Sequence, residues 1–259
     1  MPRQWRLIPL SKGAGPWQMA LDIWLLDQQI AGLQPPTLRF YTWQPVSISL
    51  GYHQRHWPAH WLHLRWQDQP IPLVRRPSGG RAVLHQGDLC YGVTLPLSGQ
   101  RQQDRYRQIC DGLIAGWQQL GVPLGYGEAG RGYIHNPSCF GTATAADLVT
   151  DQGYKLIGSA QLRRDRSLLQ QGSMRLHPDQ ALTEAVFGAA DPWQPTPAFN
   201  PAGSGQSWDE RLNLIIETMV GAIAATLGVT FEIQPLSPAE HQAVLGYLPG
   251  ALPGALTGE

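Results

Sequence analysis

The sequence predicts an α+β fold: a single domain of mixed or antiparallel β-sheets flanked by helices. Short runs of aromatic and β-branched residues, which are typical of strands, dominate the middle of the chain. Longer runs with helical spacing of apolar residues stand near both ends, and one lies between the strands. Helices and strands therefore do not alternate as they do in a doubly wound sheet, and the sequence shows no internal repeat.

Amphipathic helices are expected at residues 16–29, 104–120, 208–227 and from 237 onward, where apolar residues recur at helical spacing. In the first, Pro16 suits the opening turn, and Trp17 and Leu21 recur on one face. In the last, Ser237 and Glu240 form the two positions of a capping box, which predicts where that helix begins.

Strands are expected at residues 7–10, 37–43, 46–52, 71–74, 82–84, 89–95, 147–150, 154–159, 167–174 and 231–233. The turn Asp151-Gln152-Gly153 predicts a hairpin between two of these runs. A glycine-rich segment, 121–132, is expected to be a loop around one further short strand.

Two segments are predicted to be irregular. Residues 178–205 are rich in proline, alanine and glycine, and residues 249–259 are expected to fray. We expect one domain over residues 1–259, with its core at about 5–235 and a partly irregular tail at 236–259. A fold of this size buries roughly three quarters of the surface of its unfolded chain, so it needs no disulfide or metal for stability.

Four histidines, at positions 53, 56, 60 and 63, recur every three or four residues. On a helix they would share one face, which suggests a metal site. However, Pro58 interrupts the segment, and no carboxylate or thiol stands nearby to complete a ligand set. We therefore interpret this stretch as a partly exposed amphipathic helix and predict no metal.

Composition excludes several classes of function. The formal net charge is zero and no long basic run occurs, so nothing favours nucleic-acid binding. No apolar run approaches the ~20 residues that span a bilayer, and the N-terminus lacks a signal peptide, so no membrane association is expected. The three cysteines, Cys90, Cys110 and Cys139, are widely spaced and odd in number. This predicts a reducing, cytoplasmic location.

Two of the cysteines have the setting of packing residues. Cys110 lies in the apolar stripe of the helix at 104–120, and Cys90 lies in a predicted strand. Neither has a neighbour in the sequence that would form a reactive thiolate, so we predict that both thiols are inert.

The most informative stretch runs from Arg75 to His85 and reads Arg-Arg-Pro-Ser-Gly-Gly-Arg-Ala-Val-Leu-His. Its paired glycines, Gly79 and Gly80, leave room for a ligand beside the backbone. Its arginines are fixed cations that suit a phosphate or carboxylate. From these residues alone, a substrate loop and a solvated charged turn remain equally good interpretations.

Cys139 and Lys155 are candidates for covalent catalysis. Cys139 stands in a loop-like segment after Asn136-Pro137, where a thiol is reachable. A nucleophilic cysteine needs a nearby cation or base, and Lys155, on the predicted hairpin, could provide one. The alternative, a buried cysteine and a solvated lysine, stays open on these residues alone.

Several motifs occur together and in order: Met19-Ala20-Leu21-Asp22, Leu38-Arg39-Phe40-Tyr41-Thr42-Trp43, Ser47-Ile48-Ser49-Leu50-Gly51-Tyr52, the Arg75–His85 stretch, Lys155-Leu156-Ile157-Gly158-Ser159-Ala160-Gln161, and Leu169-Gln170-Gln171-Gly172-Ser173-Met174. This combination resembles the family of lipoate-protein ligase A and the protein N-octanoyltransferases, within the biotin/lipoate protein ligase superfamily. The resemblance runs from about Trp5 to Leu176 and implies the fold of that superfamily.

Within this family, the chain is most similar to the cysteine-dependent octanoyltransferases. Pro137-Ser138-Cys139-Phe140 looks like their cysteine loop, and Arg81 replaces the third glycine of the ligase motif. Only a helix, a strand and a short tail are expected after Gly205, whereas the larger ligases carry an added C-terminal domain.

The resemblance implies transfer of an octanoyl group from acyl carrier protein to a lysine of a lipoyl domain or of the glycine cleavage H protein. Cys139 would carry the acyl group as a thioester, without a metal or cofactor. One alternative is an ATP-dependent lipoate-protein ligase that forms lipoyl-adenylate with ATP and Mg²⁺. A biotin ligase and a non-catalytic homologue that binds lipoate or carrier proteins are weaker alternatives.

The resemblance also implies roles for individual residues. Lys155 and the Gly79-Gly80 backbone would stabilise the oxyanion, and Lys155 acts either as a cation or as a base. The expected substrate site further includes Arg75, Arg76, Ser78, Arg81, His85, Gly158, Ser159 and Ala160. At least one arginine could instead hold the loop together, and His85 is either a proton carrier or structural. The acyl chain is expected between the sheet and the helix that starts at Pro16.

Overall fold

A computed structural model of the protein describes residues 3–127, 146–188, 205 and 207–248. The strands are β1 (Arg3–Gly13), β2 (Thr37–Trp43), β3 (Ser47–Leu50), β4 (Arg65–Trp66), β5 (Gln69–Pro70), β6 (Leu73–Arg75), β7 (Val83–His85), β8 (Asp88–Pro96), β9 (Leu124–Tyr126), β10 (Leu148–Thr150), β11 (Lys155–Arg164), β12 (Ser167–Arg175) and β13 (Val229–Ile233). The helices are α1 (Gly15–Ile30), α2 (Gln102–Gln119), α3 (Gln180–Phe187), α4 (Trp208–Leu227) and α5 (Pro238–Leu245), with a 3₁₀ turn at Ala59–His63.

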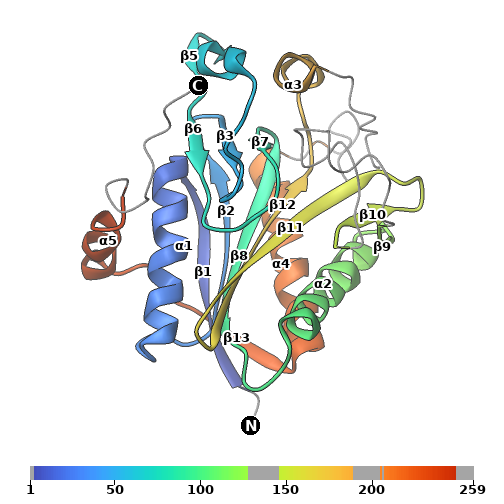
Figure 1. The fold of residues 1–259 in the computed structure, drawn as a ribbon. Coiled ribbons are helices and arrows are strands. Elements are labelled where there is room, and N and C mark those ends of the chain that lie inside the picture. The colour runs from blue at the N-terminus through green and yellow to red at the C-terminus, as the bar shows by residue number, and fades with distance from the viewer. Residues whose placement is uncertain (1–2, 128–145, 189–204, 206, 249–259) are drawn as a thin grey trace.

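The main sheet has eight strands in the order β13-β1-β2-β8-β12-β11-β10-β9. Its first three strands run parallel to one another, and all later neighbours are antiparallel. A smaller sheet, β6-β3-β7, lies beyond one end of these strands (Figure 1). The structure is therefore a mixed α+β fold, as the sequence predicts.

Side chains of the central strands point alternately to the two faces of the sheet, so the sheet separates two hydrophobic cores. In β2, Leu38 and Phe40 belong to the large core that α2 and α4 complete, whereas Tyr41 packs on the other face with Met19 of α1. In β8, Leu89 and Tyr91 belong to that same large core. Helix α1 thus covers one face of the sheet, and α2 and α4 cover the other (Figure 1).

Most predicted elements are confirmed, and two of them, β2 and α4, have the predicted bounds. Two predictions were wrong. The segment 178–205 contains α3, which Asp179 caps by accepting a hydrogen bond from the Leu182 amide at 2.8 Å. The histidine segment does not form a long helix: only the 3₁₀ turn forms after Pro58, and its Trp61 is buried.

None of the helices within the described residues combines the length and apolar character that crossing a bilayer requires. Residues 249–259 lie outside the described residues, so the predicted fraying there stays a prediction.

Helix α5 is fixed to the first strand by a buried arginine. Arg6 of β1 donates two hydrogen bonds to Glu240, at 2.6 and 2.9 Å, and others to the backbone oxygens of Gln234 and Pro235. The capping box predicted for Ser237 and Glu240 is present, so one carboxylate both caps the helix and binds Arg6. The hydrogen bond from Arg6 is the main reason why the pKa of Glu240 falls to about 2.

Replacing Glu240 by glutamine should lower the free energy of unfolding by about 1–3 kcal/mol at neutral pH, because the charge-assisted bonds to Arg6 are lost. The folded-state pKa is depressed, so this stabilisation is complete above the unfolded value near 4.5 and is lost as pH falls toward about 2. Urea denaturation of both proteins between pH 3 and 7 tests this.

Glu232→Gln is the matched control, because Glu232 is an exposed carboxylate on the neighbouring strand. It should change stability by less than about 0.5 kcal/mol. A constant difference between wild type and Glu240→Gln across this pH range would show that the charge of Glu240 does not stabilise the fold.

Candidate active site

A cavity of about 260 Å³ lies between the two sheets, on the α1 side of the main sheet. The residues that line it come from segments distant in the sequence: Met19, Tyr41, Trp43, Ser49, Arg76, Ser78, Gly79, Gly80, Arg81, Val83, His85, Cys90, Ala146, Asp147, Lys155, Gly158, Ser159, Ala160, Gln161, Gln171, Gly172 and Ser173. All the predicted site residues are among them except two. Arg75 lies elsewhere, and Cys139 lies outside the described residues.

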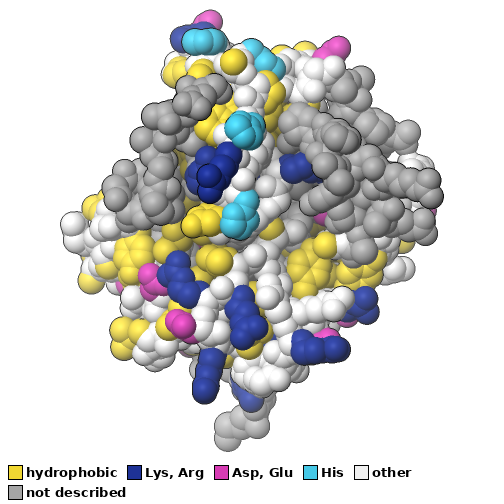
Figure 2. All heavy atoms as spheres, viewed as in Figure 1, with side chains coloured by type: hydrophobic (Ala, Val, Ile, Leu, Met, Phe, Trp, Pro, Cys, Tyr) yellow, Lys and Arg dark blue, Asp and Glu magenta, His cyan; other side chains and the backbone are white. Residues whose placement is uncertain are grey.

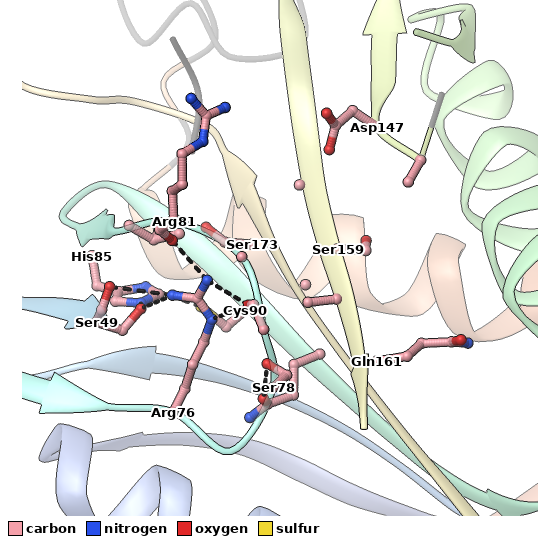
Figure 3. Close-up of a pocket in the computed structure, with 18 of the residues that line it drawn as sticks. Ser49, Arg76, Ser78, Arg81, His85, Cys90, Asp147, Ser159, Gln161 and Ser173 are labelled. Atoms are coloured by element: carbon pink, nitrogen blue, oxygen red, sulfur yellow. Dashed lines mark hydrogen bonds between the residues drawn. The ribbon is translucent and has the colours of Figure 1, made fainter. Parts of the chain in front are cut away.

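The loop between β6 and β7 forms one wall, and Arg76 organises it. Its guanidinium donates to the carbonyl oxygens of Gly79 and Arg81, at 2.8 and 2.7 Å, and to both oxygens of Ser49 (Figure 3). Arg75 donates to backbone carbonyls around Gly51. For these two arginines the structure supports the loop-holding alternative. Arg81 lines the cavity, and its side chain extends away from Arg76 (Figure 3).

Glycines allow this loop to pack against β3. A side chain at Gly51 would place its Cβ only 1.8 Å from the carbonyl oxygen of Gly80, which itself has a φ of +93°. Gly79 has open space at its Cβ position. The backbone of the Gly79-Gly80 turn therefore faces the cavity without a side chain to cover it.

A buried polar network joins this loop to the core. Ser78 donates to the side-chain oxygen of Gln171 at 2.6 Å, and the amide of Gln171 donates to Asp22. Asp22 in turn forms an ion pair with Arg39 at 2.6 Å, in which both side chains are about 1% exposed. The position of the loop thus depends on charges between α1 and the sheet.

A second network surrounds His85. Its Nδ1 lies 2.8 Å from Asp88, its Nε2 lies 2.8 Å from the Ser49 hydroxyl, and its ring stacks on Trp43. Arg76 also donates to that hydroxyl at 3.1 Å, so the Ser49 side chain links the loop to His85. Both ring nitrogens are engaged, which favours the structural role for His85.

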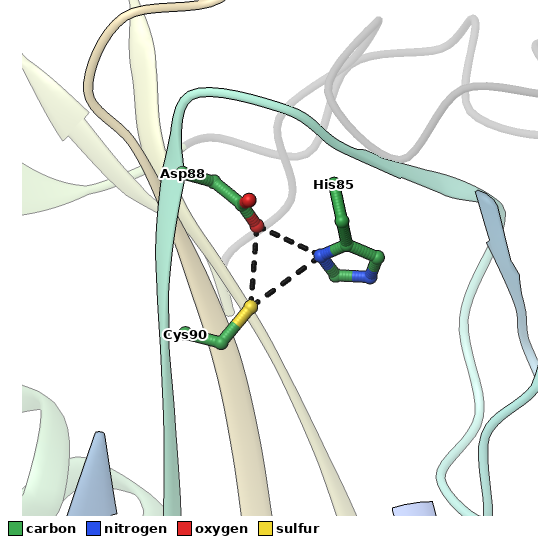
Figure 4. A group of neighbouring side chains, drawn as sticks. All are labelled: His85, Asp88 and Cys90. Carbon is green, nitrogen blue, oxygen red and sulfur yellow. Dashed lines mark hydrogen bonds and ion pairs between the residues drawn. The ribbon is translucent and has the colours of Figure 1, made fainter. Parts of the chain in front are cut away.

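Cys90 completes a triangle with His85 and Asp88, with its sulfur 3.2 Å from the carboxylate (Figure 4). Burial and the charge of Asp88 raise the pKa of the Cys90 thiol well above its ordinary value. Burial opposes ionisation of Asp88, yet the charge and hydrogen bond of His85 hold its pKa below the ordinary value. Cys90 has a charged neighbour in Asp88, but that neighbour makes the thiol less reactive, in agreement with the predicted inert thiol.

Lys155 and Asp147 lie at the opposite side of the cavity from His85 and form a buried ion pair. The lysine nitrogen is 2.8 Å from the carboxylate, and the side chains are only 4% and 6% exposed. Figure 3 shows Asp147 separated from the group around Arg76 and His85. Lys155 was predicted from its motif, but Asp147 was not, because nothing local in the sequence marks it as a partner.

The strands β8, β11 and β12 are closely packed where they border the cavity. The Ser159 hydroxyl lies 2.7 Å from that of Tyr91, and Gln170 donates to the same tyrosine at 2.9 Å. A Cβ at Gly172 would lie 2.1 Å from the Tyr91 ring. This glycine therefore makes room for the Tyr91 ring to pack against the sheet.

The inner end of the cavity is apolar. Met19, Tyr41, Trp43 and Cys90 line it and form a small core with Val74, between α1 and the sheet. The cavity lining also includes the cationic side chains of Arg81 and Lys155. On this face of the molecule, Lys and Arg side chains are spread over the middle and the lower part, some with acidic side chains beside them (Figure 2). An apolar end below a polar, cationic opening suits a substrate with an aliphatic chain and a reactive polar group.

Comparisons with known proteins identify the family. The model of the lipoyl protein ligase A/B catalytic domain matches residues 15–198. A protein of Lysinibacillus sphaericus named octanoyltransferase LipM is 34% identical over 195 residues, which cover 71% of this chain and 70% of that protein. A protein of Symbiobacterium thermophilum with the same name is 37% identical over 192 residues, or 70% of this chain and 69% of that protein.

Solved structures show the same fold. A putative lipoate protein ligase from T. acidophilum with bound lipoic acid has a TM-score of 0.72 and 23% identity, over 95% of this chain and 94% of that one. A lipoate-protein ligase A bound with ATP has a TM-score of 0.73 and 21% identity, over the same shares. The chain therefore belongs to the lipoyl protein ligase A/B catalytic domain family.

Proposed function

We propose that this protein transfers an octanoyl group from acyl carrier protein to a lysine of a lipoyl domain or of the glycine cleavage H protein. The observation that carries this proposal is the 34–37% identity to relatives named octanoyltransferases, over about 70% of their length. The proposed donor and acceptor place the reaction in the cytoplasm.

The reaction has two steps. The Cys139 thiolate attacks the thioester carbon of octanoyl-acyl carrier protein, and the carrier thiol leaves. The amine of the acceptor lysine then attacks the acyl-enzyme, which forms an amide and returns the cysteine thiol. Both steps exchange one acyl bond for another, so neither requires ATP or a metal ion.

The described residues at both ends of segment 128–145 support a role for Cys139 at the cavity. The Gly127 amide donates to the Asp147 carbonyl at 2.8 Å, and Ala146 and Asp147 line the cavity. The seven residue steps between Cys139 and Ala146 span at most about 25 Å. The sequence position of Cys139 is therefore compatible with attack on a group held in the cavity.

Each step passes through a tetrahedral oxyanion, which requires preorganised donors. The Lys155 ammonium and the uncovered backbone of the Gly79-Gly80 turn lie along the same cavity and are suited to this. The acyl chain would occupy the apolar end beside Met19 and Trp43. The cationic surface above would favour an acidic carrier protein.

The test is acyl transfer to a purified lipoyl domain, measured by the mass of the acceptor. We expect octanoylation with octanoyl-acyl carrier protein as the sole donor and without ATP. If the acceptor is modified only when ATP, Mg²⁺ and free octanoate or lipoate are supplied, the protein is a ligase and the proposal fails. If no condition modifies any acceptor, the protein is a non-catalytic homologue.

A further inference from the structure

Lys155 faces the cavity with a single acidic partner among the described residues that line it, namely Asp147. Their ion pair is almost inaccessible to water, since the two side chains are 4% and 6% exposed. A lysine buried to this extent without a counter-charge would favour the neutral amine, because desolvation disfavours the charged form. The Asp147 carboxylate, at 2.8 Å, provides that counter-charge.

A local irregularity in the pairing of β10 with β11 lies beside Lys155 and Asp147. In the pairing of β10 with β11, Leu148 lies opposite Ile157, but the next residue, Val149, lies opposite Lys155. Two residues of β11 thus correspond to one of β10, as in a β-bulge, which changes the direction of side chains. Asp147 immediately precedes β10, and its carbonyl oxygen is held by the Gly127 amide.

We propose that Asp147 is a positioning residue that holds Lys155 as an ammonium directed at the reacting acyl group. This inference rests on the proposed acyl transfer and decides between the two roles of Lys155 that the sequence left open. As an ammonium, Lys155 stabilises the oxyanion and the Cys139 thiolate, and it accepts no proton. The acceptor lysine must then attack as a free amine, and its surplus proton passes to the departing Cys139 sulfur.

Among the described residues that line the cavity, Asp147 is the only carboxylate. Apart from Lys155, the other titratable or charged groups that line it are Tyr41, Arg76, Arg81, His85 and Cys90, and the charge of Asp147 also reaches Tyr106 and Cys110 of α2. Burial is the main cause that raises the pKa of Tyr106 above its ordinary value and that of Cys110 to about 12. The charge of Asp147 is a smaller cause in both cases. These two groups therefore do not titrate near neutral pH.

The sequence makes a direct test practical, because Lys12 and Lys155 are its only lysines. Protein labelled with ¹³C at lysine Cε should show two lysine resonances. Lys12, which is about half exposed and paired with Asp209, serves as an internal reference. In Asp147→Asn, the Lys155 resonance should reach its neutral-amine position at lower pH than in the wild type, while that of Lys12 stays unchanged.

The kinetic test measures acyl-enzyme formation from octanoyl-acyl carrier protein against pH. Asp147→Asn should lower the rate constant about 10²-fold at neutral pH, which is the effect of losing one oxyanion donor. On the alkaline side, the activity of Asp147→Asn should begin to fall at a lower pH than that of the wild type. Its KM should change little. Asp147→Glu should restore much of the rate. Asp151→Asn, an exposed acid in the turn of the same hairpin, should match the wild type.

Two results would overturn the inference. One is a Lys155 resonance that changes at the same pH in wild type and Asp147→Asn. The other is an Asp147→Asn rate that falls equally at every pH, which indicates a structural role. Failure of the wild type to form any acyl-enzyme would instead refute the proposed function, and the NMR titration would still decide how Asp147 acts on Lys155.

Discussion

Replacing Asp22 by alanine should lower the free energy of unfolding by about 3–5 kcal/mol, which is a large part of the stability of a typical domain. The loss leaves Arg39, about 1% exposed, as a buried charge without its carboxylate. Its remaining hydrogen-bond partners are the side-chain and backbone oxygens of Gln18, which carry no charge. Urea denaturation at neutral pH measures the effect.

Asp27→Ala, on the same helix, is the matched control. Asp27 pairs with Arg164, but both side chains are partly exposed, so this bond should contribute less than about 1 kcal/mol. The double variant Asp22→Leu/Arg39→Met should recover part of the stability, because it removes both buried charges. A cost for Asp22→Ala no larger than that for Asp27→Ala would contradict the interpretation of this pair.

Replacing Cys139 by alanine should lower kcat for octanoyl transfer by about 10⁴-fold or more, because an alanine side chain cannot form the acyl-thioester. The described cysteines do not offer a substitute. Cys110 and Cys90 are buried, and burial raises the pKa of each thiol. The measurement is the initial rate of lipoyl-domain octanoylation at saturating donor.

Cys110→Ala is the control for loss of a thiol, since Cys110 lies in the core on α2. It should reduce stability but keep the acyl-transfer rate within a few-fold of the wild type. Comparable rates for Cys139→Ala and the wild type would exclude the acyl-thioester mechanism.

Strong local patterns made much of the fold predictable. The strand at 37–43 has the predicted bounds because it is rich in aromatic and β-branched residues, and the helix at 208–227 because its apolar periodicity is long. Helix α3 was missed because prolines, alanines and glycines dominate its surroundings, and its cap at Asp179 was found only in the structure. The histidine spacing predicted a helix wrongly, because the segment packs through Trp61 and not through a continuous apolar face.

The site was predictable where one motif contained it. Lys155 and the glycine turn were expected from contiguous residues, and both line the cavity. Asp147 and Gln171 act through partners that the fold brings together, and spacing along the chain cannot reveal such contacts. The same limit applies to Arg76, whose hydrogen bonds to its own loop depend on the three-dimensional course of the turn.

The most direct test of the account is the intact mass of the protein after mixing with octanoyl-acyl carrier protein in the absence of ATP. The account predicts gain of a single octanoyl group, its removal by hydroxylamine as expected for a thioester, and no gain in Cys139→Ala. A wild-type protein that stays unmodified but octanoylates the acceptor once ATP and free octanoate are added would contradict it.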